Sequence, residues 1–279
     1  MEGMRIKLSI RIVLSVLCFL FTALWLVPVI AALVTSFRTY DDILLNGFWS
    51  IPKSLTFSNF IEAWNRGGLA HYLPNSFIIT IPCLIGTLFL SSLGGYALSR
   101  FRFPGNKLIL FIFVAGMMLP FQILLLPVFK LTDALNIYDT YWALIIFHTS
   151  FQLGFCTFVL RNYMRTVPGE ILEAARVDGC SEFRTYWQIM MPLTLPAMGA
   201  LATLEFTWIF NDFLWALILL QRDALKPVST GMATLVGQYI MEWTVITAGS
   251  ITAALPTVIV FLFLQRYFVA GLTLGAVKG

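Results

Sequence analysis

The stretch RNYMRTVPGEILEAARVDGCSEFRTYWQIMMP, residues 161–192, is a polar interruption in a chain that is otherwise strongly apolar. It predicts two short helices joined by a turn. The first begins near Pro168, because proline is tolerated in a first helical turn, and ends at Gly179, because glycine adopts a left-handed conformation at low cost. Ser181 is placed to cap the second helix, which Pro192 is expected to end. We therefore predict a helix–turn–helix hairpin that lies outside the membrane.

The composition indicates a protein whose solvent is lipid. Of the 279 residues, 59% are hydrophobic and 11% are charged, with a mean hydropathy of +0.84, whereas soluble domains contain about 25% charged residues. The cysteines and histidines are far apart and form no CxxC pair, which disfavours a disulfide framework or a metal site. We expect membrane lipid around the chain, no metal ligands, no catalytic residues and no nucleic-acid partner.

Six apolar runs are long enough to cross a bilayer as helices, which predicts an all-α polytopic membrane protein made of a single domain, residues 1–279. The third run is interrupted at Leu119-Pro120 and again at Pro127, and the second ends in small residues (Ser91–Ala97), as close helix packing in membranes requires. The hairpin connects the fourth and fifth spans. The spans are expected at residues 12–37, 76–99, 108–129, 141–160, 193–220 and 245–264.

The distribution of basic residues predicts the orientation of the chain. With the N-terminus inside, the inner segments hold twelve Lys and Arg residues, and the outer segments hold six. Both termini and the hairpin are therefore expected in the cytoplasm. The inner segments are 1–11, 100–107, 161–192 and 265–279. The outer segments are 38–75, with one short helix expected, the short turn 130–140, and the loop 221–244.

The hairpin carries a motif with defined spacing. Glu173-Ala174-Ala175 is followed after three residues by Gly179, and after nine more by Ile189, one residue and Met191-Pro192. This pattern resembles the signature loop of the permeases of binding-protein-dependent ABC importers, with Met191 in place of the usual Leu, a volume-conserving change. Three further segments resemble the carbohydrate-type branch of that family, which includes the smaller permease subunit of the bacterial maltose transporter. These segments are Phe101–Gly105, Met118–Pro120 and Gly271–Gly279.

The resemblance implies that the hairpin is a coupling helix, which docks into a cleft on a cytoplasmic ATPase subunit. The residues expected at that contact are Glu173, Ala174, Ala175, Arg176, Asp178 and Gly179. Because the chain has no GxxxxGK[ST] phosphate loop, ATP and Mg are expected on separate subunits, and the chain is expected to be a transport subunit rather than an enzyme. The implied assembly, in a bacterial or archaeal inner membrane, contains a second homologous permease, two ATPase subunits contacting residues 161–192, and an extracytoplasmic sugar-binding protein.

The implied function is ATP-driven import of a sugar or oligosaccharide, and three alternatives stay open. One is an importer of the same family for a non-sugar solute such as glycerol-3-phosphate. Another is a secondary transporter or channel that works without ATP, which is expected to show more intramembrane charges or matched broken helices in two halves. The third is a membrane enzyme, which needs a convergent set of catalytic side chains.

Two acids in the fifth span, Glu205 and Asp212, indicate a second candidate region, since an ionisable residue in the membrane is costly unless it is paired or faces water. The acids are seven residues apart, nearly on one face of a helix, with Trp208 between them on that face and Asn211 adjacent. Aromatic faces and hydrogen-bonding groups suit a sugar, and the segment WIFNDFL (Trp208–Leu214) resembles a family segment. These four residues are candidates for the substrate path, and structural pairing with another helix is the alternative.

The loop at residues 221–244 supports one further hypothesis. In maltose-type relatives, the corresponding external loop reaches into the binding protein and helps to displace the sugar. The loop in this chain has the length and the glycines for such a role. A plain external connector is the other interpretation.

Overall fold

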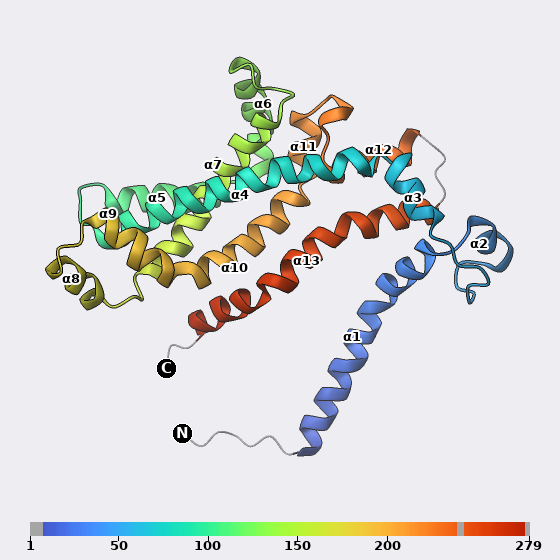
Figure 1. Ribbon diagram of the computed structural model, residues 1–279, viewed down its shortest axis with the longest axis horizontal. Helices are drawn as coiled ribbons and strands as arrows, with labels where there is room; N and C mark the ends of the chain where they lie inside the picture. Colours follow the sequence, from blue (N-terminus) through green and yellow to red (C-terminus); the bar gives the residue numbers. More distant parts are fainter. Residues whose placement is uncertain (1–7, 239–242, 277–279) are drawn as a thin grey trace. The chain divides into compact units, whose positions relative to one another are not determined.

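The computed structural model describes residues 8–238 and 243–276 of the chain. Two compact units are present: the first extends to Leu69 and includes the described part of Thr234–Ala253, and the second, here called the core unit, comprises Ala70–Ala233 and the described residues from Ala254 onward. The helices, labelled in Figure 1, are α1 (Leu8–Ser36), α2 (Tyr40–Asn46), α3 (Ser58–Asn65), α4 (Leu69–Arg100), α5 (Asn106–Met117), η1 (Phe121–Leu124), α6 (Leu125–Ala134), α7 (Tyr141–Met164), α8 (Gly169–Val177), α9 (Glu182–Thr185), η2 (Tyr186–Met190), α10 (Met191–Phe210), α11 (Leu214–Leu219), η3 (Asp223–Leu225), α12 (Val228–Gln238) and α13 (Trp243–Ala276).

The predicted all-α polytopic fold is confirmed. Among the described residues, five helical segments are long and apolar enough to cross a membrane, and a bent pair of helices provides a sixth candidate. Several bounds differ from the prediction, because polar residues at helix ends do not stop a membrane helix. The second span begins at Leu69 rather than at residue 76, and segment 38–75 contains two short helices, α2 and α3, instead of one.

The third span is broken rather than straight. Helix α5 and the helical segment Phe121–Ala134, made of η1 and α6, meet at an angle of 96° across residues 118–120. Pro120 has an extended backbone (φ −60°, ψ 118°) and lacks an N–H group, and a residue before proline is disfavoured in a helix. The predicted interruption at Leu119-Pro120 is therefore confirmed, whereas Pro127 lies within α6, where a first-turn proline removes no hydrogen bond. The predicted turn at 130–140 shortens to residues 135–140, because α6 continues to Ala134.

Helices α4 and α7 are parallel and packed closely along their length. The register is constant: Gly86 faces Thr149, and Gly94 faces Thr157, so a Cβ atom at either glycine would lie 3.3 Å from a threonine methyl carbon. Gly95 approaches the backbone nitrogen of Arg161, at 3.0 Å from its would-be Cβ. Because small residues let helix backbones approach in lipid, the predicted role of the Ser91–Ala97 segment in packing is confirmed.

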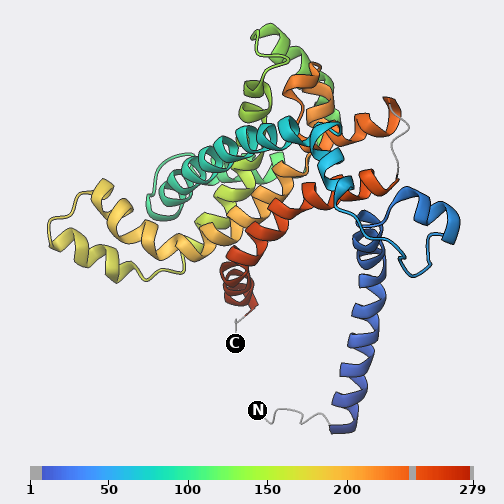
Figure 2. The same cartoon turned by 45° about the vertical axis from the view of Figure 1, so that its right-hand side comes forward.

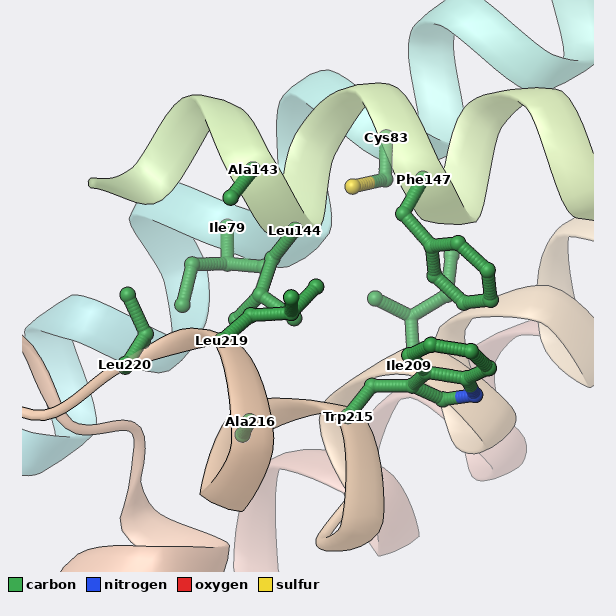
Figure 3. Close-up of a cluster of buried hydrophobic side chains, with 10 residues drawn as sticks. All are labelled: Ile79, Cys83, Ala143, Leu144, Phe147, Ile209, Trp215, Ala216, Leu219 and Leu220. Carbon is green, nitrogen blue, oxygen red and sulfur yellow. The ribbon is translucent and has the colours of Figure 1, made fainter. Parts of the chain in front are cut away.

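An apolar cluster fixes α11 against α4 and α7. Trp215 lies over Phe147 with ring centroids 3.7 Å apart, and Leu219 is fully buried beside Ile79 of α4 and Leu144 of α7 (Figure 3). Because lipid tails are as apolar as these side chains, close van der Waals packing is what stabilises the cluster. The short helix α11 is therefore held firmly even though it follows a break in the fifth span.

In the first unit, a hydrogen-bond network surrounds Arg38, two residues after the end of α1. The Arg38 side chain is fully buried; its Nε donates to Asp42 Oδ2 at 2.7 Å, and its terminal nitrogens donate to Ser50 Oγ at 2.7 Å and to the Phe48 carbonyl at 2.9 Å. The Arg38 guanidinium holds the pKa of Asp42 below its usual value. The segment that follows α1 is therefore a folded cap rather than a loose loop.

Candidate functional site

Helix α8 has the ends that the sequence predicts. Pro168 precedes its first residue with an extended backbone, and Glu170 lies in the first turn, where the helix dipole favours an anion. Gly179 has a φ of +78°. The Gly179 N–H donates to the Arg176 carbonyl at 3.0 Å, and the Cys180 N–H donates to the Ala175 carbonyl at 2.9 Å. These two bonds form a Schellman C-cap, which requires a residue such as glycine at its left-handed position.

The second helix of the hairpin begins as predicted but does not end at Pro192. Ser181 caps α9 by accepting the Arg184 N–H at 3.3 Å. The helix then continues without a break from Glu182 to Phe210, through the π turn η2 and into α10. The expectation that Pro192 ends this helix is therefore wrong. The π turn directly before Pro192 shifts the carbonyls that the proline ring would otherwise meet, so the helix accommodates it.

The hairpin lies at one end of the core unit, here called the hairpin end, and is fixed there by one side of α8 (Figures 1 and 2). Leu172 is 3% exposed and packs in a cluster with Tyr96 of α4, Met164 of α7, and Tyr186 and Met190 of the second hairpin helix. Ala175, on the same side of α8, is also buried. Ala175 was expected to face a partner subunit, but its small side chain instead packs within its own chain.

Polar contacts add to this anchoring. Glu182 accepts a hydrogen bond from Arg176 Nε at 2.7 Å through one oxygen and from the Tyr96 hydroxyl at 3.0 Å through the other. Arg176, a predicted contact residue, therefore also bridges the two hairpin helices. Arg100, the last residue of α4, donates to the Met164 carbonyl and, at 2.7 Å, to the Val167 carbonyl beyond the end of α7. The hairpin is thus attached to both α4 and α7.

The opposite side of α8 is exposed to solvent. Glu170, Glu173, Ala174 and Val177 are all exposed, with Val177 at 87%, and they follow the i, i+3, i+4, i+7 pattern of one helix face. We call these four residues the docking face. Asp178 and Gly179 are exposed at its end. The face offers two carboxylates beside an apolar strip, and the anchored side behind it keeps it in place.

The second candidate region is a break in the fifth span at residues 211–213, between α10 and α11. Asp212 caps α11 by accepting the Trp215 N–H at 3.5 Å and the Ala216 N–H at 3.1 Å. His148 Nε2 of α7 lies 3.5 Å from Asp212 Oδ2. Glu205 is fully buried, and its Oε1 accepts from the Cys156 thiol at 3.2 Å. Glu205 therefore points into the core unit with only its Oε1 hydrogen-bonded among the described residues, and the partly buried Asp212 lies between His148 and the first turn of α11.

Trp208 and Asn211 are the more exposed members of this segment. Trp208 is 47% exposed and its ring centroid lies 5.6 Å from that of Phe155 of α7, next to the Cys156 that contacts Glu205. Asn211 is exposed, with its amide donating to the Thr207 carbonyl at 2.8 Å and to Thr257 Oγ1 of α13 at 3.4 Å. The expected common face does not extend from Glu205 and Trp208 to Asp212, because α10 ends at Phe210.

The far end of the core unit, opposite the hairpin, is closed by a network around segment 221–228. Arg222 Nε donates to Asp139 Oδ2 at 2.7 Å, while the Gln221 and Arg222 N–H groups donate to Asp139 Oδ1 at 2.8 and 3.0 Å. Although burial raises the pKa of Asp139, these bonds lower it below its usual value overall. The Asn75 amide of α4 also donates to the Ala224 and Lys226 carbonyls at 2.9 and 3.0 Å. The first third of the predicted loop 221–244 is therefore fixed.

Comparisons with known proteins identify relatives along most of the chain. Residues 88–273, which include the hairpin, match the family model described as "Binding-protein-dependent transport system inner membrane component". The chain is 36% identical over 255 residues to the arabinooligosaccharides transport system permease protein of Halalkalibacterium halodurans, covering 90% of this chain and 91% of that one. It is 30% identical over 265 residues to the diacetylchitobiose uptake system permease protein of Streptomyces coelicolor, covering 94% and 87%.

The fold also has a match among solved structures. It matches a chain in the crystal structure of a bacterial ABC transporter involved in the import of the acidic polysaccharide alginate, with a TM-score of 0.83, 23% identity, and coverage of 96% of this chain and 99% of that one. The matches define a class, the permease components of membrane transport systems. The chain belongs to the family of binding-protein-dependent transport system inner membrane components.

Several residues of the two regions were missed by sequence reasoning. Tyr96 and Arg100, in the second span, hold the hairpin, and His148 faces Asp212. Tyr96 and Glu182 are 86 residues apart in the chain. Their pairing depends on how the helices pack, and the position of Glu182 in the first turn after Ser181 does not indicate its partner in the second span.

Proposed function

We propose that this chain is the permease subunit of an ATP-driven importer and that the docking face of α8 contacts a cytoplasmic ATPase subunit. The observation that carries the proposal is the two-sided character of α8. Leu172 and Ala175 fix one side to the core unit, while Glu170, Glu173, Ala174 and Val177 leave the other exposed. An exposed apolar strip with flanking charges on a fixed helix is what a partner protein can bind without ordering a loop.

The proposed partners follow from the family and from the chemistry of the chain. ATP and Mg are bound by two separate ATPase subunits, a second homologous permease completes the path, and a binding protein outside the membrane delivers the solute. A solved structure with the same fold, at a TM-score of 0.67, is described as a bacterial alginate ABC transporter in complex with an alginate pentasaccharide-bound periplasmic protein. The hairpin and both termini lie in the cytoplasm, in line with the excess of Lys and Arg in those segments.

We propose a sugar or oligosaccharide as the transported solute. Relatives along the whole chain are described as permeases for arabinooligosaccharides, diacetylchitobiose and, at 34% identity over 234 residues in Rhizobium meliloti, alpha-glucosides. Trp208 and Asn211 are the path candidates that remain exposed, and an aromatic face beside an amide suits a polyhydroxylated solute. Glu205 and Asp212 are proposed to support the path through the contacts of Glu205 with Cys156 and of Asp212 with His148 and α11.

In the proposed mechanism, ATP closes the two ATPase subunits, which move the docked hairpins. Each hairpin continues without a break into the fifth span through η2 and α10, so a tilt of α8 and α9 reaches the break at residues 211–213 along one helix. The translocation path between the two permeases opens outward to receive the solute, and hydrolysis returns the path to the inward-open state. Helix α12 lies beyond the fixed segment 221–228 and is proposed to contact the binding protein.

The ATPase contact is tested by reversing charge on the docking face. Glu173→Lys in the purified assembly is expected to reduce recovery of the ATPase subunits and the hydrolysis rate at least ten-fold, because the change reverses a charge on the face that the partner is proposed to complement. Asp133→Lys is the matched control, because Asp133 is an exposed acid on α6, outside the hairpin. Equal recovery of the ATPase with wild type and with Glu173→Lys would contradict the proposal.

The α12 contact has its own test. Replacing Thr234–Gln238 with a glycine-serine stretch of equal length leaves the first turn of α12 in place. We expect the stimulation of ATP hydrolysis by loaded binding protein to disappear. Undiminished stimulation would show that this segment is only a connector.

A further inference from the structure

A small cavity lies beside the break in the fifth span, within the core unit. Its volume is about 10 Å³, close to the minimum that one buried water molecule needs. Most of the lining residues are apolar, and the polar ones come from two helices and the break itself: Ser76 and Thr80 of α4, His148 of α7, and Asp212. A cavity of this size with several polar groups in its wall is typical of a site for ordered water.

Thr80 supplies the observation that points to a ligand. Its side chain is 1% exposed, and its Oγ1 has no hydrogen-bond partner within the described parts of the chain. A threonine in a helix commonly bonds to the carbonyl four residues earlier, as Thr203 does to Gly199 at 2.9 Å and Thr207 to Thr203 at 2.8 Å. Thr80 does not, so its hydroxyl is left for a group in the cavity that it lines.

The other polar groups have capacity for the same group. His148 is 5% exposed, and its Nε2 lies 3.5 Å from Asp212 Oδ2, longer than the usual 2.7–3.2 Å of an N–H···O bond. Ser76 Oγ accepts the Val228 N–H at 2.8 Å, and a hydroxyl that accepts one bond can still donate one. A metal cation fits less well, because only three of the polar lining side chains carry oxygen, whereas hard cations take about six oxygen ligands.

We propose that one water molecule binds in this cavity, between Thr80 and the His148–Asp212 pair, and completes a junction that joins α4 and α7 to the start of α11. Water has both donors and acceptors, so it can satisfy the Thr80 hydroxyl and the carboxylate together. Buried polar groups that a water satisfies jointly act as one network, and removing a member weakens the remaining contacts.

The junction also reaches the first turn of α12. The Asp212 carbonyl accepts from Ser229 Oγ at 2.5 Å, and the neighbouring Val228 N–H is the one held by Ser76. A displacement of α12 therefore acts on both sides of the cavity at once. This part of the inference rests on the proposed function: if the binding protein moves α12, the water-filled junction passes that movement to the break in the fifth span.

The experiment uses the complete transporter with its ATPase and binding-protein partners, and two substitutions at one position. Thr80→Val keeps the shape of the side chain and removes the hydroxyl, and Thr80→Ser keeps the hydroxyl. In a map that shows ordered waters, we expect density within hydrogen-bond distance of residue 80 and Asp212 in wild type and Thr80→Ser, and none in Thr80→Val. The absence of this density in wild type, or a Thr80 hydroxyl bonded to the Ser76 carbonyl, overturns the water site.

The coupling role has a separate readout. The ratio of hydrolysis with loaded binding protein to hydrolysis without it is expected to fall at least three-fold in Thr80→Val and to stay at the wild-type value in Thr80→Ser. An unchanged ratio in Thr80→Val refutes the coupling role even if the water is present. If wild type shows no stimulation by any binding protein, the proposed function fails, while the map still decides whether the water is bound.

Discussion

A substitution at Gly179 tests the role of the hairpin turn, because it changes the energy of the backbone conformation and introduces no steric clash. The residue has a φ of +78°, and a Cβ atom added to it would meet no atom within 4 Å. Gly179→Ala therefore introduces backbone strain without a clash. The left-handed conformation costs a residue other than glycine about 1–2 kcal/mol. An undocked hairpin can relieve this strain by changing the turn, whereas a docked hairpin must keep it, so binding loses up to the same free energy, which corresponds to an affinity for the ATPase subunit up to roughly 5- to 30-fold weaker.

The chain offers a matched control for this substitution. Gly105, between α4 and α5, has a φ of +89° and likewise no atom within 4 Å of an added Cβ. Gly105→Ala therefore carries a similar strain outside the hairpin. The assay titrates the ATPase subunit onto the membrane assembly in detergent and measures half-saturation and hydrolysis. We expect the weakened affinity in Gly179→Ala only. An unchanged affinity in Gly179→Ala, or an equal loss in Gly105→Ala, would refute the argument that the Schellman turn positions the docking face.

Two further predictions concern the ends of the core unit. Leu172→Ala is expected to destabilise the hairpin by about 2–5 kcal/mol, because it leaves a cavity in the cluster with Tyr96 and Met164, whereas Ile171→Ala, at a residue 40% exposed, should cost far less; limited proteolysis of the hairpin in the purified protein measures the difference. At the far end, Asp139 has a lowered pKa in the folded chain, so its contribution to stability is fully present above the unfolded-state value of about 3.9 and is lost as the pH falls through the lower folded value. Thermal unfolding of wild type and Asp139→Asn should therefore differ near neutral pH and converge in strong acid, and a constant difference across that range would contradict the assignment.

Local features of the hairpin could be predicted from the sequence because they depend on neighbouring residues. Proline before a helix, glycine after it and a serine cap act over one turn each, and all three are found at Pro168, Gly179 and Ser181. Pro192 was misjudged by the same local logic. A membrane helix has no water to accept its broken hydrogen bonds, so it absorbs a proline through a π turn rather than ending.

The candidate path was only partly predictable, because its geometry depends on a break in the helix. The one-face argument for Glu205, Trp208 and Asp212 assumes a continuous helix, and α10 ends at Phe210. Asp212 then caps α11 and meets His148, which the sequence marks only as an isolated histidine. Which partner an intramembrane acid finds is decided by the packing of α4, α7 and α10, and the sequence pattern does not encode that packing.

The basic residues of the outer segments have a consequence for the insertion of the chain into the membrane. Arg38, Arg66 and Lys226 each pair with an acid three or four residues away, Asp42, Glu62 and Asp223. Such pairs join residues close together in the sequence, so they can form before distant parts of the chain have folded. In the proposed orientation these segments cross the bilayer during biogenesis, and each unpaired charge moved through a potential of 100 mV changes the energy by about 2.3 kcal/mol. Because each of these cations crosses together with an acid of opposite charge, the membrane potential does almost no net work on the pair. Insertion of the apolar spans then drives the translocation of these segments.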